Sequence, residues 1–170
     1  MEKKKVYARL IAGGILFFFL LTGLQSLFSK VVITLDKSTP FTFYLKNKER
    51  KLEELSFVLV RGKKNTFAEG KLLTKQVLCA YPKTLKKEGM DFYCCSGVCR
   101  HLHTAMKKTP KGTKLIPFNP CGGNPYTSKC EVKIPEGKYY LGTNVPDGYD
   151  SRYMGFFDKK DVLAVLTPIF

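Results

Sequence analysis

Histidine is scarce in this chain of 170 residues: there are two, His101 and His103, and both lie in one cysteine-rich stretch. A Ser-His-Asp catalytic triad would have to use one of them, so we do not expect a triad. No serine is followed by a lysine three residues later, which excludes the S-x-x-K motif of penicillin-recognising enzymes. A Gly-rich phosphate-binding loop is also missing.

Acidic side chains are few as well. The chain has 14 Asp and Glu against 29 Lys and Arg, which gives a formal net charge of +15. Such a balance suits an anionic partner, either nucleic acid or an anionic membrane surface. The lysines are scattered along the chain rather than aligned on one helix, so we expect no nucleic-acid partner and favour the lipid bilayer.

One long uncharged run, residues 10–28, is sufficient to span a bilayer at about 1.5 Å per residue of helix. Because basic residues precede this run, the positive-inside rule leaves the N-terminus in the cytoplasm and exports the rest. The alternative, a cleaved signal peptide, needs a shorter apolar core and an A-x-A-like site, and neither is present. We therefore expect a single-pass anchor preceded by Lys3, Lys4, Lys5 and Arg9.

The exported part is expected to be mainly β, because no long stretch shows a clean helical period. Together with the uncharged run, this predicts two parts. Residues 1–30 are expected to form a cytoplasmic N-terminus and a transmembrane helix, and residues 31–170 an exported β domain of many short strands. Within that domain, residues 81–130 are rich in Gly, Pro, Cys and Lys, and we expect an irregular, disulfide-linked insertion there. The strands are expected at 31–35, 55–62, 71–79, 133–146 and 161–170.

Six cysteines in an exported domain indicate disulfides, although their connectivity is open. The alternative is a zinc site built on the stretch CCSGVCRHLH, which holds three cysteines and both histidines. The spacing fits no standard ligand set, so we favour disulfides and expect no metal and no cofactor. A bridge between the neighbours Cys94 and Cys95 would be strained, so each is expected to pair elsewhere.

A lysine interrupts the apolar face of the strand predicted at 71–79, where Leu73, Lys75, Val77 and Cys79 alternate. Burying an amine costs free energy unless the amine is paired or neutral. Lys75 is therefore either a lysine on an edge strand whose amine extends to solvent, or a general base whose pKa is lowered by burial.

A base of this kind requires a nucleophile. Of the seven serines, Ser38 is the best placed, because it lies just outside the membrane segment and close to Pro40. The alternative is an ordinary turn serine, which is the commoner fate of such residues.

The C-terminal residues 133–170 resemble the conserved block of type I signal peptidases. The matching runs are Gly-Thr-Asn at 142–144 and Asp-Ser-Arg-Tyr-Met-Gly-Phe at 150–156. The stretch LLTKQVLCAYP resembles the lysine block of the family, and its catalytic lysine falls on Lys75. The stretch KSTPFTFYL resembles the serine block in the shorter form of TraF-like peptidases of conjugative transfer, and its nucleophile falls on Ser38.

This resemblance implies a signal-peptidase-like β domain and a membrane-anchored serine endopeptidase with a Ser38–Lys75 dyad. It implies that the enzyme cleaves signal or leader peptides from exported precursors through an acyl-enzyme. The TraF-like form suggests a conjugative pilin as substrate, with the conjugative pilus or secretion machinery as partner. The implied location is the bacterial inner membrane, with the catalytic domain in the periplasm.

The chain departs from the family pattern at three positions. Thr143 replaces the first aspartate of the block, and Gly148 replaces the serine before Asp-Ser-Arg. Asp36 stands where many relatives carry a serine that helps to bind the oxyanion, and an ionised carboxylate cannot donate a hydrogen bond. The oxyanion hole is then expected to use the Ser38 backbone N–H and a second donor, with Thr34 and Thr39 as candidates.

The Asp-Ser-Arg run is expected to support the site rather than to do chemistry. Asp150 and Arg152 share one side of an extended segment, where they can pair with each other or join neighbouring strands. Ser151 either reaches toward Lys75 or is a strand hydroxyl bonded to the backbone, and the sequence does not decide between them.

A non-catalytic alternative is a disulfide-linked assembly factor of a secretion or conjugation apparatus. It would keep the anchor and the β domain and use the surface to bind partners. The departures at Thr143 and Gly148 are its best support.

Overall fold

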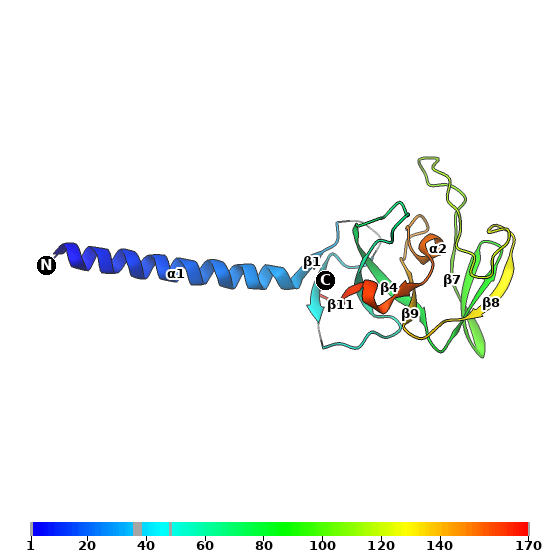
Figure 1. Cartoon of the computed structure of the whole chain (residues 1–170), viewed down its shortest axis with the longest axis horizontal. Coiled ribbons are helices and arrows are strands. Elements are labelled where there is room, and N and C mark those ends of the chain that lie inside the picture. Colours follow the sequence, from blue (N-terminus) through cyan, green and yellow to red (C-terminus); the bar gives the residue numbers. More distant parts are fainter. Residues whose placement is uncertain (1, 36–38, 48, 170) are drawn as a thin grey trace.

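The computed structural model describes residues 2–35, 39–47 and 49–169. A long helix, α1 (Glu2–Lys30), projects from a β domain that holds the rest of the described chain (Figure 1). The stretch Gly13–Lys30 of α1 has a mean hydropathy of 1.3 and is long and apolar enough to cross a membrane. A single helix near an N-terminus is weak evidence by itself, because a signal sequence has the same properties.

The described strands form two antiparallel sheets, one of seven strands and one of four. The larger sheet has the order β1-β2-β11-β3-β4-β9-β10, and the smaller has the order β7-β6-β5-β8. The larger sheet consists of β1 (Val31–Ile33), β2 (Phe43–Asn47), β3 (Phe57–Arg61), β4 (Leu72–Ala80), β9 (Lys138–Gly142), β10 (Phe157–Asp158) and β11 (Val162–Pro168). The smaller sheet consists of β5 (Thr84–Glu88), β6 (Asp91–Ser96), β7 (Val98–Thr104) and β8 (Lys129–Lys133).

The mainly β fold is confirmed, and each predicted strand has a counterpart in the larger sheet. The segment 81–130 is more regular than expected, because β5, β6 and β7 lie within it and only the stretch between β7 and β8 is mostly irregular. Alternation explains the strands: Leu85 and Lys87 are buried on β5, and Phe92 and Cys94 are buried on β6.

The six cysteines form three disulfides, as expected, and Cys94 and Cys95 pair with different partners. Cys79–Cys94 joins β4 of the larger sheet to β6 of the smaller one. The other pairs are Cys95–Cys99, across the β6–β7 hairpin, and Cys121–Cys130. Because no free cysteine remains, the proposed zinc site has no thiolate ligands.

The core between the two sheets contains Leu78, Leu85, Phe92, Ile134 and Tyr140. A second cluster lies on one face of the larger sheet and includes Val58, Val60, Val77, Leu141 and Phe157. Burial of these side chains positions β4, which contributes to both clusters.

Two short helical segments follow β9. They are α2 (Ser151–Met154) and the 3-10 turn η1 (Lys159–Asp161). The prediction of an extended Asp-Ser-Arg segment is wrong, because these residues form the start of α2. Asp150 is its N-cap and accepts from the Arg152 backbone N–H at 3.0 Å, and Gly155 ends the helix with φ of 69°.

Candidate active site

Lys75 is buried, with 3% of its surface exposed, near the middle of β4. It pairs with Val58 of β3, and residues that face each other across strands point to the same side of a sheet. The amine therefore lies on the side that carries Leu73, Val77 and Val58, which belong to one apolar cluster. β4 lies between β3 and β9, so the alternative of an edge-strand lysine is wrong.

Ser38, the predicted nucleophile, lies outside the described residues, as does Asp36. The chain just before them is placed by Thr34, which is buried and donates its hydroxyl to Thr74 Oγ1 at 3.2 Å. Thr74 directly precedes Lys75, so this part of the chain contacts β4 one residue away from Lys75. Successive strand residues alternate, so Thr74 itself points to the opposite side of β4 from Lys75.

The segment 31–35 also borders a cavity of about 540 Å³ together with Leu59, Leu72 and Thr74. Thr74 was not singled out in the sequence. Its only signal there is its position beside Lys75, since its bond to Thr34 joins residues 40 positions apart.

The two candidate oxyanion donors, Thr34 and Thr39, are both buried. Each hydroxyl has an acceptor: Thr34 donates to Thr74, and Thr39 donates to the Phe41 carbonyl at 3.2 Å. A hydroxyl can rotate, so either one would have to exchange this bond for a bond to the oxyanion. The assignment of the second donor stays a prediction.

Asp150 and Arg152 form a fully buried ion pair, with Arg152 Nη2 and Nε at 2.8 and 2.9 Å from the carboxylate oxygens. Burial opposes the charge on Arg152, but the Asp150 carboxylate outweighs burial and raises the pKa of the guanidinium. Of the two alternatives for these residues, the pair with each other is the one observed.

The remaining donors of Arg152 hold the loop that follows β9. Nη2 donates to the carbonyls of Val145 and Gly148 at 3.0 and 2.8 Å, and Nη1 donates to the Pro146 carbonyl at 2.5 Å. A further bond of 3.3 Å reaches the Thr104 carbonyl at the end of β7. The pair therefore connects α2, the loop and the smaller sheet.

Thr143 and Gly148, the two departures from the family block, belong to the same network. Thr143 donates its backbone N–H and its hydroxyl to Asp150 Oδ2 at 3.1 and 3.2 Å. A Cβ on residue 148 would overlap Thr143 Oγ1 and lie 3.0 Å from Arg152 Nη2. The absence of a side chain at Gly148 thus leaves the space that the Thr143 hydroxyl occupies.

Ser151 is fully buried, and its Oγ accepts from the Leu141 backbone N–H of β9 at 2.8 Å. Of the two alternatives, the backbone-bonded hydroxyl is the one observed, although it lies in α2 rather than in a strand. Leu141 pairs with Val77 of β4, two residues beyond Lys75. The hydroxyl thereby ties α2 to the strand that lies next to β4.

His103, on β7, is a titratable group close to the network of Asp150 and Arg152. Its Nε2 lies 2.9 Å from the hydroxyl of the fully buried Tyr140. Burial is the main cause that lowers the pKa of His103 to about 4, and it also raises the pKa of Tyr140. Burial therefore favours the neutral form of His103, whose ring contacts Tyr140 of β9.

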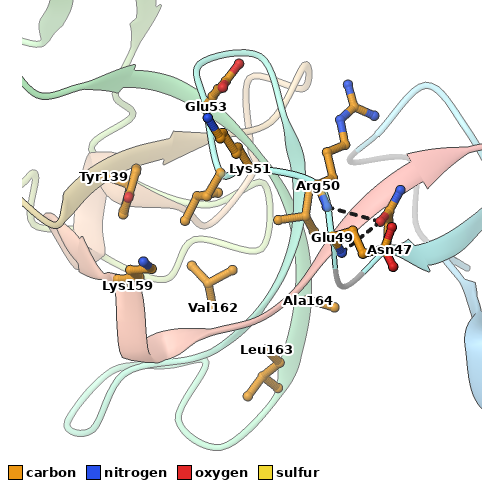
Figure 2. Close-up of a pocket in the computed structure, with 12 residues that line it drawn as sticks. Asn47, Glu49, Arg50, Lys51, Glu53, Tyr139, Lys159, Val162, Leu163 and Ala164 are labelled. Atoms are coloured by element: carbon orange, nitrogen blue, oxygen red, sulfur yellow. Dashed lines mark hydrogen bonds between the residues drawn. The ribbon is translucent and has the colours of Figure 1, made fainter.

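A pocket of about 760 Å³ lies between β11 and the loop that follows β2. Figure 2 shows Asn47 at one side of it, where its side-chain oxygen accepts from the backbone N–H groups of Glu49 and Arg50. None of the predicted site residues lines this pocket, so we do not assign it to the site. The described residues also contain no cluster of three or more metal-ligating side chains.

Comparison with protein families defines the class. The family model described as signal peptidase, peptidase S26, matches residues 10–170, nearly the whole chain, and this match defines a peptidase. The chain belongs to the S26 family of signal peptidases, whose function is signal-peptide cleavage. The finer resemblance, to the TraF-like peptidases, stays a prediction.

Among solved structures, the chain is similar to a signal peptidase I from Enterococcus faecalis V583. The two are 23% identical, the alignment covers 69% of this chain and 98% of that one, and the TM-score is 0.42. No curated protein matches the chain.

Proposed function

We propose that this protein is a membrane-anchored serine endopeptidase that removes signal peptides with a Ser38–Lys75 dyad. The observation that carries the proposal is the burial of Lys75 on an apolar face of a central strand, in a chain of the S26 family. Burial disfavours the ammonium form, so the amine can act as a base. The bond between Thr34 and Thr74 holds the chain that leads to Ser38 against β4, one residue along the strand from Lys75 and on its opposite face.

In the proposed reaction, neutral Lys75 takes the proton of the Ser38 hydroxyl as its oxygen attacks the scissile carbonyl. The backbone N–H of Ser38 and either Thr34 or Thr39 donate to the oxyanion. Collapse of the intermediate breaks the C–N bond, and the Lys75 ammonium returns its proton to the leaving amine. Water, deprotonated by Lys75, then hydrolyses the ester to release the signal peptide and regenerate both residues.

The proposed arrangement places residues 1–30 as the cytoplasmic tail and anchor, and residues 31–170 as the periplasmic catalytic domain with its insertion at 81–130. Asp150, Ser151 and Arg152 support the site through β9, which pairs with β4. The proposed substrates are exported precursors with signal peptides. A conjugative pilin is the narrower proposal, and it rests on the form of the serine block alone.

The alternative of a non-catalytic assembly factor rests on Thr143 and Gly148. The two residues fit together, and both contacts of Thr143 with Asp150 are present. The departures therefore leave the buried network complete, which favours the peptidase.

The proposal predicts that Ser38→Ala and Lys75→Met each abolish precursor cleavage in membranes, whereas Ser96→Ala and Lys71→Ala, at exposed positions, cleave normally. Lys75→Met keeps the length and apolar stem of the side chain, so folding is preserved. Cleavage is followed by gel mobility of a candidate exported precursor. Cleavage by either dyad variant at the wild-type rate would reject the dyad.

The rate should also rise with pH as the base loses its proton, measured as kcat/KM. A flat profile from acid to alkaline pH would argue against a lysine base.

A further inference from the structure

A third cavity, of about 750 Å³, lies outside the proposed active site. Three segments that are distant in sequence form its walls: residues 65–67, 109–118 and 147–153. We refer to it as the distal cleft. In Figure 1, the segment that follows β7, which supplies one wall, extends outward at the end of the domain remote from α1.

The lining of the distal cleft is mostly apolar and aromatic. Phe67 and Ile116 are 73% and 62% exposed, which is unusual for side chains of this size. The Phe67 and Tyr149 rings lie 5.9 Å apart, and Tyr149 stacks on Tyr153 at 5.3 Å. Aromatic walls of this kind bind apolar side chains and extended peptide backbone.

The walls are held in place by hydrogen bonds. The Met106 backbone N–H donates to Tyr153 Oη at 2.8 Å, and the Phe118 N–H donates to the Arg152 carbonyl at 2.6 Å. The wall at 109–118 is part of a hairpin over residues 107–115, whose ends are joined by a bond of 2.8 Å from the Leu115 N–H to the Lys107 carbonyl. The distal cleft is therefore formed before any ligand binds, which reduces the entropy cost of binding.

The rim of the distal cleft is strongly basic. Residues 92–130 contain no aspartate or glutamate. Lys107, Lys108, Lys111 and Lys114 are all exposed on the hairpin, and the latter two line the cleft. Asp147 is the single acidic residue among the lining residues. The charge of the rim therefore complements an acidic ligand.

We propose that the distal cleft docks an extended, acidic segment of the precursor, from the part that remains after cleavage, with apolar side chains held by the aromatic wall. The wall at 109–118 extends away from α1 (Figure 1), which favours an exported polypeptide over a lipid surface. This inference rests on the proposed function for the identity of its ligand. The loop after β9 joins the cleft to the buried Arg152 network, because Asp147 and Tyr149 line the cleft and the carbonyls of Val145 and Gly148 accept from Arg152.

The test is equilibrium binding to the full chain in lipid nanodiscs, measured by fluorescence anisotropy. The probe is a fluorescein-labelled peptide with phenylalanine and leucine between runs of glutamate, and the matched probe carries glutamine in place of each glutamate. Neither probe contains a signal sequence. The variants are Lys111→Glu with Lys114→Glu, and separately Phe67→Ser. The charge-matched control is Lys51→Glu with Lys160→Glu, at exposed positions that do not line the cleft.

We expect the acidic peptide to bind more tightly than the glutamine peptide, and added salt to weaken its binding. Reversal of the two cleft lysines should weaken binding by about tenfold, and Phe67→Ser should have an effect of about the same size. The control should bind as the wild type does. Because all five positions are exposed, each variant is expected to fold, which circular dichroism checks.

Equal affinity for the two peptides, or unchanged affinity in both cleft variants, would overturn the proposal. It would also be overturned if lysine reversal weakened binding of short-chain phosphatidylglycerol and left peptide binding unchanged, since the cleft would then be a lipid site. Binding is measured without cleavage, so a chain that binds the peptide but cleaves no precursor would reject the proposed function and leave the docking site intact.

Discussion

The described part of the β domain contains two buried lysines with different surroundings. Lys87, on β5, is fully buried, and its amine donates to the carbonyls of Gly89 and Pro125 and lies 3.4 Å from Ser128 Oγ. Burial lowers its pKa, but the two carbonyls can only accept hydrogen bonds, so they favour the protonated form. Lys75 instead lies on an apolar face of a central strand. Burial alone therefore does not identify a catalytic lysine, and the proposed role of Lys75 rests on its strand and on the family match as well.

At the residue scale, local signals in the sequence offered alternatives between which the structure decides. Alternation along 71–79 made burial one of two interpretations of Lys75, and proximity in sequence made a mutual ion pair one of two interpretations of Asp150 and Arg152. Lys87 gave no such signal, because its burial and its bond to Pro125 depend on a loop 38 positions away. The helical turn at α2 was missed, although an aspartate N-cap and a glycine after the helix are a readable pattern.

At His103, stability should depend on pH. Its pKa falls from 6.5 to about 4 on folding, mainly through burial, so the unfolded chain takes up the proton more readily. Asp150 opposes this shift, whereas Arg152 and His101 add to it, and Tyr140 faces the ring from β9. The contribution is fully present above pH 6.5 and is lost as pH falls through 4, at a cost of about 3 kcal/mol.

The measurement for this prediction is the free energy of unfolding by urea, at pH values between 7 and 4, for the wild type and His103→Gln. Other groups also titrate in this range, so the difference between the two proteins isolates His103. Parallel pH profiles would contradict the prediction.

Thr143 and Gly148 should be energetically coupled. Gly148→Ala places a methyl group on the Thr143 hydroxyl, so we expect a loss of about 1–3 kcal/mol from overpacking. Thr143→Ala removes the hydroxyl, and the double variant should recover part of that loss. A double-mutant cycle on urea unfolding measures the coupling. Strictly additive effects would show that the two positions do not share this space.

At the scale of elements, the disulfides should differ in importance. Cys79–Cys94 joins the two sheets and closes a 15-residue separation, whereas Cys95–Cys99 closes 4 residues within one hairpin. Loop-closure entropy predicts a loss of about 3 kcal/mol on replacing the first pair with alanine and about 2 kcal/mol for the second. Cys79 and Cys94 are also buried in the core, which should enlarge the difference.

The check is the urea midpoint of each double-alanine variant against the wild type, with precursor cleavage as a second readout. Because β4 contains both Cys79 and Lys75, only the first replacement should slow cleavage. A larger effect from the hairpin pair would contradict this view of how β4 is held.

Five of the seven strands of the larger sheet were expected from the sequence, because each contains a short apolar or aromatic run; β2 and β10 were not among them. The smaller sheet was not expected, since β5 and β7 are rich in lysine, arginine and histidine, and their composition resembles a loop. Their strand structure comes from pairing with β6, which is a long-range contact. The order of strands in the larger sheet also cannot be predicted from local sequence patterns, because β11, the last strand, inserts between β2 and β3.

At the scale of the whole molecule, the proposed anchor α1 predicts membrane behaviour. We expect the full chain to stay in the pellet after alkaline carbonate extraction. Phe18→Arg should release a substantial fraction, because an arginine at the centre of a membrane helix costs about 2.5–3.5 kcal/mol on insertion. Phe67→Arg, which adds the same charge at an exposed position of the β domain, is the control. Extraction of the wild type as readily as Phe18→Arg would contradict the anchor.

The junction between helix and sheet has a further consequence. α1 ends at Lys30 and β1 begins at Val31, and the Lys46 ammonium donates to the Ser29 carbonyl at 2.8 Å. If α1 spans the bilayer, this junction contains no flexible linker, so the β domain is held at a fixed distance from the lipid. The distance from the membrane to the proposed active site would then also be fixed. Adding residues between the membrane segment of a precursor and its cleavage site should therefore shift or prevent cleavage.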